Sequence, residues 1–146
     1  MGKLEVSVVI KRPVEEVFSF VNNPANEPLW SSGLVESSQI SEGPVGVGTQ
    51  MREVNRILGK RIEHIYEITE YEPNRGYSCK SISGPFPWRG AYTFEPVKGG
   101  TRVTMTGEFQ RIGSVFKLAE PLITRMAKRQ FQADFNNLRD LMEART

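Results

Sequence analysis

Five stretches between Met51 and Phe109 alternate apolar and polar residues, and four successive turns bring their apolar faces into agreement. Alternation with a period of two is typical of strands that bury one face. Opposed residues of an antiparallel pair share a sheet face, so each turn fixes how its two strands are related. A slip of one residue at any turn would reverse every later strand. The agreement therefore predicts a continuous antiparallel meander with one buried face.

The turns also predict which residues lie opposite each other. Gly59-Lys60, Pro73-Asn74, residues 84–87 and residues 97–100 separate the five strands. The predicted pairs are Ile57 with Ile62, Asn55 with His64, Ile68 with Cys79, Tyr66 with Ser81, Cys79 with Tyr92, Tyr77 with Phe94, Phe94 with Val103 and Tyr92 with Met105.

The segment before the meander predicts two further strands and two short helices. Lys3 to Ile10 alternates cleanly and predicts a first strand, which Arg12-Pro13 ends. Apolar residues from Val14 to Val21 recur at helical spacing, and Asn22-Asn23-Pro24 stops that helix. We expect a second short helix at residues 25–30, then a strand at residues 34–40 and a glycine-rich loop.

A long amphipathic segment closes the chain. Apolar residues recur at helical spacing from Ser114 to Arg145, and Pro121 is expected to kink the helix or to begin its regular part. At about 1.5 Å per residue, residues 121–144 would form a helix about 36 Å long. Such a helix can cross six or seven strands and bury one face against them.

Three stretches resemble the polyketide cyclase/dehydrase-type branch of the START-like (SRPBCC) superfamily. They are Ile10 to Phe18 (IKRPVEEVF), Tyr66 to Pro73 (YEITEYEP) and Gly99 to Thr104 (GGTRVT). The resemblance covers essentially the whole chain and implies an α+β helix-grip fold, a curved seven-stranded antiparallel sheet wrapped on a long C-terminal helix. It also implies a cavity between sheet and helix. Members bind or transport lipids, sterols, polyketides and plant hormones, and a minority catalyse cyclisation or dehydration, so fold does not settle function.

The composition narrows the function classes. A length of 146 residues suits one START-like domain spanning residues 1–146. The net charge of +2, from 19 basic and 17 acidic residues, is too balanced to indicate nucleic-acid binding. One cysteine, Cys79, excludes an internal disulfide, and one histidine, His64, leaves little for a metal site. We expect no metal, no cofactor, no membrane span and a cytoplasmic protein, either a monomer or a homodimer.

The predicted register gathers polar side chains on the inward face of the sheet. Glu53, Asn55, His64, Tyr66 and Ser81 share that face, and each would cost about 1–3 kcal/mol if buried without a partner. They form a structural hydrogen-bonded network, a ligand-binding patch or a catalytic group. The candidate catalytic residues are His64 as general acid or base, Tyr66 and Glu53. The candidate ligand-binding residues are Asn55, Ile68, Ser81, Phe86, Trp88, Tyr92, Phe94, Met105, Phe109, Ile123 and Met126.

Three functions remain open from the sequence. The first is binding of a small hydrophobic or aromatic, lipid- or polyketide-like ligand, with Phe86 and Trp88 at the rim of the cavity. The second is a polyketide cyclase or dehydratase in which His64 acts as acid or base and Tyr66 or Tyr92 polarises a carbonyl. The third is an adaptor that acts through protein contacts.

Overall fold

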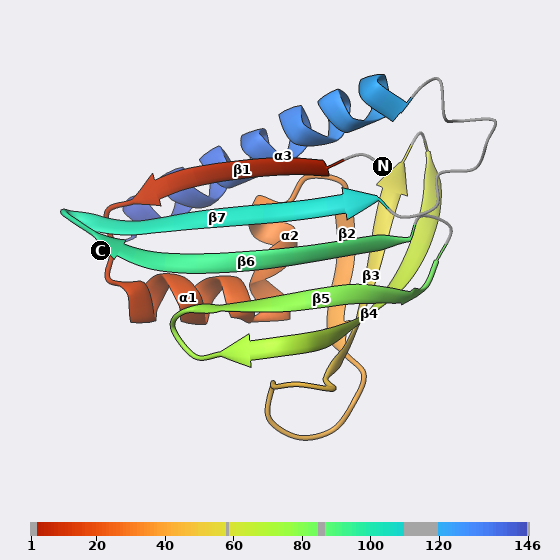
Figure 1. The fold of residues 1–146 in the computed structure, drawn as a ribbon, viewed down its shortest axis with the longest axis horizontal. Coiled ribbons are helices and arrows are strands. Elements are labelled where there is room, and N and C mark those ends of the chain that lie inside the picture. The colour runs from red at the N-terminus through yellow and green to blue at the C-terminus, as the bar shows by residue number, and fades with distance from the viewer. Residues whose placement is uncertain (1–2, 58, 85–86, 110–119, 146) are drawn as a thin grey trace.

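A seven-stranded antiparallel sheet dominates the computed structural model, which describes residues 3–57, 59–84, 87–109 and 120–145 (Figure 1). Its spatial order is β1-β7-β6-β5-β4-β3-β2, so each strand from β2 to β7 lies beside the next along the chain, and β1 closes onto β7. The strands are β1 (Lys3–Ile10), β2 (Leu34–Gln39), β3 (Gln50–Ile57), β4 (Lys60–Glu72), β5 (Gly76–Ser83), β6 (Trp88–Val97) and β7 (Gly100–Phe109).

The helices are α1 (Val14–Asn22), the 3-10 turn η1 (Pro24–Asn26), α2 (Glu27–Trp30) and α3 (Glu120–Glu143). In the view of Figure 1, α1 and α2 lie behind the sheet, and α3 runs along its upper edge beside β1. Pro13 directly precedes α1, and Pro121 stands in the first turn of α3, where a missing N–H costs nothing. This arrangement is the predicted helix-grip fold. The expected start of the last helix at Ser114 lies outside the described residues.

The predicted register is correct at two turns and displaced by two residues at the other two. Tyr66 lies opposite Ser81 and Phe94 opposite Val103, as predicted. Between β3 and β4 the prediction is wrong, because Ile57 pairs with Lys60. Only residues 58 and 59 then connect the strands. The turn has the predicted length of two residues but lies one residue earlier than Gly59-Lys60, and Gly59 takes the left-handed φ of 79° that such a turn uses.

The second displacement lies between β5 and β6, where Cys79 faces Gly90 and Tyr77 faces Tyr92. The regular ladder ends early here. Ser81 Oγ accepts a hydrogen bond of 2.8 Å from the backbone N–H of Trp88, so a side chain replaces part of the ladder. A shift of two residues preserves the side-chain face, so the inward and outward sets survive both corrections.

Irregular pairing bends the sheet. The register shifts in β4 between Ile65 and Tyr66 and between Ile68 and Glu70, and the β2–β3 ladder shifts after Leu34. Such bulges insert an extra residue and increase the local twist. They curve the long strand β4, so that its inward face partly surrounds the helices.

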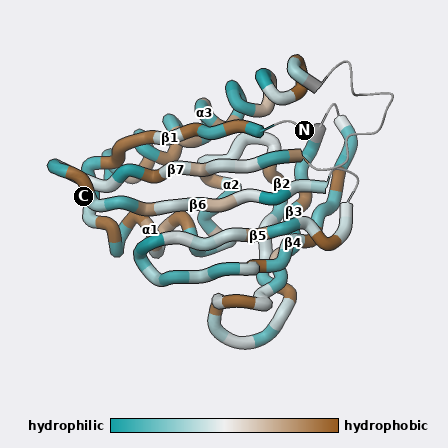
Figure 2. Tube along the Cα trace, in the orientation of Figure 1, coloured by the Kyte–Doolittle hydropathy of each residue, from teal (hydrophilic) through white to brown (hydrophobic). Residues whose placement is uncertain are grey.

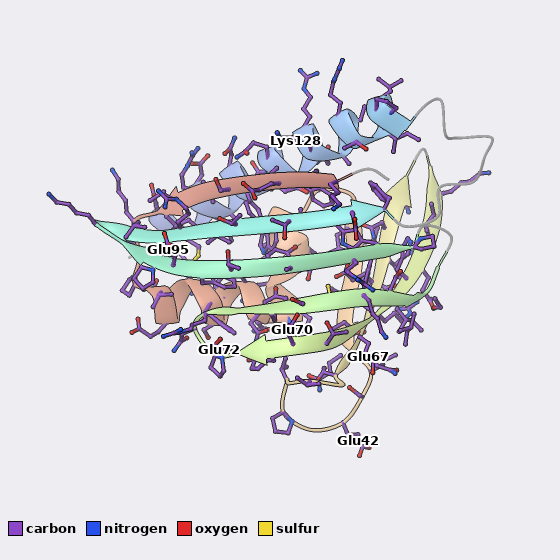
Figure 3. All side chains as sticks on the ribbon, viewed as in Figure 1. Glu42, Glu67, Glu70, Glu72, Glu95 and Lys128 are labelled. Atoms are coloured by element: carbon purple, nitrogen blue, oxygen red, sulfur yellow. The ribbon has the colours of Figure 1, made fainter. Side chains whose placement is uncertain are left out.

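The outward face of the sheet carries charged residues, as the alternation predicts. Glu67 and Glu95 lie on this face in Figure 3, and Glu70 lies there too because the register shift after Ile68 reverses the alternation. Figure 2 shows hydrophilic and hydrophobic stretches on the same strands. Exposed cross-strand ion pairs lie on this face, and in one of them Arg52 lies 2.8 Å from Glu63. Arg61 pairs with Glu36, and Arg102 with Glu95, in the same way. Each such pair contributes little to stability, about 0–1 kcal/mol.

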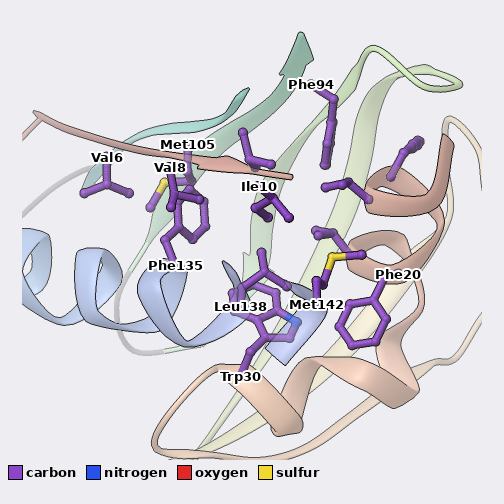
Figure 4. Close-up of a cluster of buried hydrophobic side chains, with 14 of the residues drawn as sticks. Val6, Val8, Ile10, Phe20, Trp30, Phe94, Met105, Phe135, Leu138 and Met142 are labelled. Atoms are coloured by element: carbon purple, nitrogen blue, oxygen red, sulfur yellow. The ribbon is translucent and has the colours of Figure 1, made fainter. Parts of the chain in front are cut away.

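The hydrophobic core lies between the sheet and the helices at one end of the molecule (Figure 4). Strand β1 contributes alternate residues, and α3 contributes Phe135, Leu138 and Met142, which are at most 1% exposed. Helix α1 adds Phe18, whose ring stacks on Phe94 at 5.1 Å. This packed end fixes α3 against the sheet.

Candidate functional site

A cavity of about 630 Å³ lies between the sheet and the helices. The sheet supplies most of its wall, α2 covers one side and α3 another. The residues that line the cavity include Glu27, Trp30, Met51, Glu53, Asn55, His64, Tyr66, Ile68, Tyr77, Cys79, Trp88, Tyr92, Met105, Phe109, Ala127, Phe131 and Phe135.

Aromatic rings form much of the cavity wall. Tyr77 and Tyr92, opposed on β5 and β6, stack with centroids 5.1 Å apart. Phe131 and Phe135 on α3 approach this wall from the helix side, at 5.6 Å from Trp88 and 6.2 Å from Tyr92 respectively. Flat apolar faces on opposite walls suit a ligand with flat or greasy parts.

Trp88 owes its position to a glycine on the neighbouring strand. A Cβ atom added to Gly107 would lie 2.1 Å from Trp88 Cζ2, so the indole lies directly on the backbone of β7. The ring of Phe109 packs edge-to-face against the Trp88 indole, with the two ring centroids 4.8 Å apart. Any larger residue at position 107 would push the indole away from β7.

Two glutamates meet inside the cavity. Glu27 belongs to α2 and Glu53 to β3, and their carboxyl groups share a side-chain hydrogen bond. Burial raises the pKa of both carboxyl groups, and the neighbouring Glu53 raises that of Glu27 further, well above its usual value. Both side chains line the cavity and are half-buried. Two close carboxyl groups cannot both ionise freely, so the pair retains a proton above the usual range.

Other ionisable groups around the cavity are held neutral. Burial raises the pKa of Tyr66, Tyr77 and Tyr92, so these phenols keep their protons and can donate hydrogen bonds. Burial and the glutamate pair raise the pKa of the Cys79 thiol to about 12. Because the thiolate is the nucleophile, Cys79 is a buried neutral group rather than a nucleophile at neutral pH.

His64 lies on β4 directly opposite Glu53 and is 5% exposed. Its ring stacks on Tyr66 at 5.8 Å, and the backbone of Gly84 covers it so closely that a Cβ there would lie 2.3 Å from Cδ2. Burial lowers the pKa of the imidazole. His64 is therefore neutral at pH 7, the form that accepts a proton as a general base and can return it once protonated. The predicted neighbour Asn55 instead lies opposite Ile62.

Most of the predicted site residues line the cavity. Among the candidates, the cavity brings together Glu53, Asn55, His64, Tyr66, Ile68, Trp88, Tyr92, Met105 and Phe109. Phe86 lies outside the described residues. The inward placement of Met126 is wrong, since its side chain is 63% exposed. Ile123, Ser81 and Phe94 are also absent from the wall: Phe94 packs against Phe18 in the core, and Ser81 Oγ is bound to the backbone of Trp88.

The sequence interpretation missed the contribution of the α2 region. Glu27 and Trp30 stand on a four-residue helix whose pattern is too short to show a face. The buried indole Nε1 of Trp30 has no hydrogen-bond partner among the described residues. Asp134 of α3 was also missed; its Oδ1 accepts hydrogen bonds from Ser32 N at 3.1 Å and Gln130 Nε2 at 2.9 Å. These bonds tie the segment after α2 to α3.

Neither a metal centre nor a membrane span is evident in the described part of the chain. Within residues 3–57, 59–84, 87–109 and 120–145, no group of three His, Cys, Asp or Glu side chains is placed to hold a metal ion. No helix in these ranges is long and apolar enough to cross a membrane.

The glutamate pair gives stability a defined pH dependence. A carboxyl group whose folded pKa is raised stabilises the fold fully below its unfolded pKa, and this contribution is lost as pH rises through the folded pKa. We expect Glu27→Gln to remove most of that loss, because the pKa of Glu27 is raised further than that of Glu53 and a glutamine cannot ionise. Each pKa unit corresponds to about 1.4 kcal/mol. The variant should therefore gain about 1 kcal/mol or more over the wild type between pH 4 and pH 8.

The measurement is urea denaturation of both proteins at pH 4 and pH 8. Glu42→Gln, in the exposed loop before β3, serves as the control and should track the wild type at both pH values. An equal stability difference between Glu27→Gln and wild type at the two pH values would show that the carboxyl groups are not coupled.

A family model described as polyketide cyclase / dehydrase and lipid transport matches residues 1–143. A comparison with curated protein sequences gave no significant match.

Several solved structures share the fold at low sequence identity. The protein TTHA0849 from Thermus thermophilus is 19% identical, with a TM-score of 0.83 and coverage of 98% of this chain and 99% of that one. The Zhui aromatase/cyclase from Streptomyces sp. R1128 is 15% identical, with a TM-score of 0.79 and coverage of 97% and 93%. The di-domain ARO/CYC BexL from the BE-7585A biosynthetic pathway is 19% identical, with a TM-score of 0.77 and coverage of 98% and 47%. Identities this low establish the fold alone.

Proposed function

We propose, since this chain belongs to the polyketide cyclase / dehydrase and lipid transport family, that it binds a small hydrophobic or aromatic molecule between the sheet and α3. The observation that carries the proposal is the cavity itself. Its volume of about 630 Å³ falls in the usual range for small-molecule sites, about 300–1,000 Å³. A core that was merely filled would leave few voids larger than a water molecule.

The composition of the wall supports a mainly apolar ligand with one polar end. Rings of Tyr77, Tyr92 and Phe131 offer flat contact surfaces, while Glu53 and His64 offer hydrogen bonds on the β3–β4 side. A few polar groups in an apolar pocket fix the orientation of a ligand, whereas the apolar area supplies most of the affinity.

The test uses N-phenyl-1-naphthylamine, a neutral aromatic probe whose fluorescence rises in apolar surroundings. We expect saturable enhancement at one probe per chain and a higher melting temperature. A ligand that binds only the folded state stabilises it by RT ln(1 + [L]/Kd), about 2.7 kcal/mol at 100 times Kd. A probe that neither becomes fluorescent nor raises the melting temperature would count against a ligand cavity.

A second candidate function is cyclisation or dehydration of a polyketide-like substrate. It is favoured by a neutral imidazole at His64, directly across from Glu53 on the cavity wall. There His64 would exchange the proton while Tyr66 or Tyr92 donated a hydrogen bond to a carbonyl. Two structurally similar proteins are described as aromatase/cyclase and ARO/CYC, respectively.

His64→Ala separates the two functions. With a linear poly-β-ketone analogue as substrate, the enzyme hypothesis expects the variant to lose about 100-fold or more in turnover, typical of a lost acid–base group. It should still bind N-phenyl-1-naphthylamine. Unchanged product formation by His64→Ala would remove His64 from the mechanism and leave binding as the function.

A further inference from the structure

Acidic side chains dominate the cavity lining, with Glu27, Glu53 and Asp134 against one arginine, Arg56. Glu27 from α2 and Glu53 from β3 bring two carboxyl groups into it, joined by a hydrogen bond. Among the described residues that line the cavity, Arg56 is the one arginine or lysine, and its side chain belongs to an exposed residue on β3. No ammonium or guanidinium inside the described wall is therefore paired with the two glutamates.

The rings beside this pair add to the negative potential. Tyr66, Tyr77 and Tyr92 stand close enough to the glutamates for the charges to act on their phenol groups. The face of an aromatic ring carries partial negative charge and attracts a cation within about 6 Å. An organic ammonium group suits these surroundings, because its N–H groups can donate to the carboxyl oxygens and its positive charge is attracted to the ring faces.

We propose that the cavity selects ligands that carry an ammonium group on an aromatic or aliphatic body, and that it discriminates against carboxylates. This inference rests on the proposed binding function and specifies the class of ligand. Without a ligand the pair retains a proton, and an ammonium group between Glu27 and Glu53 would favour release of that proton and donate to both carboxylates. A carboxylate in the same place would bring a further negative charge beside two half-buried carboxyl groups, which weakens binding because no cation among the described residues pairs with it there.

Three probes with one ring system test the inference: 2-naphthylmethylamine, 2-naphthylmethanol and 2-naphthoate. They share a naphthalene body and differ in a single polar group, which at pH 7 is cationic, neutral or anionic. Each is titrated against protein loaded with N-phenyl-1-naphthylamine. We expect the amine to bind about tenfold or more tightly than the acid, which corresponds to about 1.4 kcal/mol, with the alcohol between them.

Variants locate the origin of this preference. Glu27→Gln and Glu53→Gln should each reduce the ratio of amine to acid affinity about tenfold or more, whereas Glu42→Gln, in the exposed loop before β3, should leave it unchanged. The wild-type ranking of the three probes stands even where one of the variants does not fold.

The possible outcomes separate the two levels of the proposal. If N-phenyl-1-naphthylamine and all three naphthalene probes fail to bind, the ligand-binding function itself is overturned. If the alcohol binds but the acid binds as tightly as the amine, the selection for ammonium groups is overturned and the binding function stands. An amine preference that persists in both glutamine variants would also overturn the role of the carboxyl pair.

Discussion

Replacing Phe135 with alanine is expected to destabilise the protein by about 3–5 kcal/mol, the usual cost of removing a buried aromatic ring. Phe135 is 1% exposed and stands where α3 meets both the cavity and the core. Its ring lies 6.2 Å from the rings of Trp30 and of Tyr92, so it joins α2 to the sheet. The void left by the ring would merge with the existing cavity, and α3 would lose its central contact.

Urea denaturation measures this loss, with Met126→Ala as the matched control on the same helix. Met126 is 63% exposed, and exposed substitutions usually change stability by less than about 0.5 kcal/mol. A loss below about 1 kcal/mol for Phe135→Ala would mean that α3 is not held on the sheet by this face.

Filling the cavity from the helix side is expected to abolish ligand binding. Ala127 lies on α3 and lines the cavity, so an indole at this position would occupy space that the ligand needs. We expect Ala127→Trp to weaken N-phenyl-1-naphthylamine binding at least about 100-fold, a loss of about 2.7 kcal/mol. Overpacking a full core costs about 1–3 kcal/mol. Because the new ring enters an existing void, Ala127→Trp should lose less stability than that. Fluorescence titration measures the binding loss, and thermal unfolding measures the stability.

Met126→Trp is the control for this substitution. It adds the same indole one residue earlier on the same helix, at a side chain that is exposed rather than directed into the cavity. Its probe affinity should match that of the wild type. Equal weakening in both variants would indicate a general effect on α3, and undiminished binding in Ala127→Trp would place the probe elsewhere.

Most of the strand faces could be predicted from the sequence because side chains alternate; the exception is β4 after Ile68, where a register shift turns Glu70 outward. The register at two turns was wrong by two residues, yet Glu53 and His64 remained on the inward face, since parity survives an even shift. Their exact opposition was not predictable. It depends on where the two-residue turn lies, one residue earlier than the predicted Gly59-Lys60, and the sequence pattern alone does not distinguish the two positions.

The features that give the site its chemistry were largely beyond sequence reasoning. Glu27 pairs with Glu53 across the cavity, but a four-residue helix carries no periodicity that could reveal it. The Trp88 indole packs on the backbone of Gly107, a contact between neighbouring strands that no local sequence pattern shows. Met126 was misplaced because apolar residues at helical spacing put both Met126 and Ala127 on the inward face, whereas only Ala127 lines the cavity.

The most direct test of a ligand site between the sheet and α3 is the location of a bound molecule, which the methionine methyl groups can report. Met51 and Met105 line the cavity, Met142 is buried in the core, and Met126 faces outward. With methyl-¹³C methionine and saturating N-phenyl-1-naphthylamine, we expect intermolecular nuclear Overhauser effects from the probe to the methyl groups of Met51 and Met105. The methyl groups of Met126 and Met142 should show none. A bound probe that contacts Met126 and neither Met51 nor Met105 would contradict a ligand site between the sheet and α3.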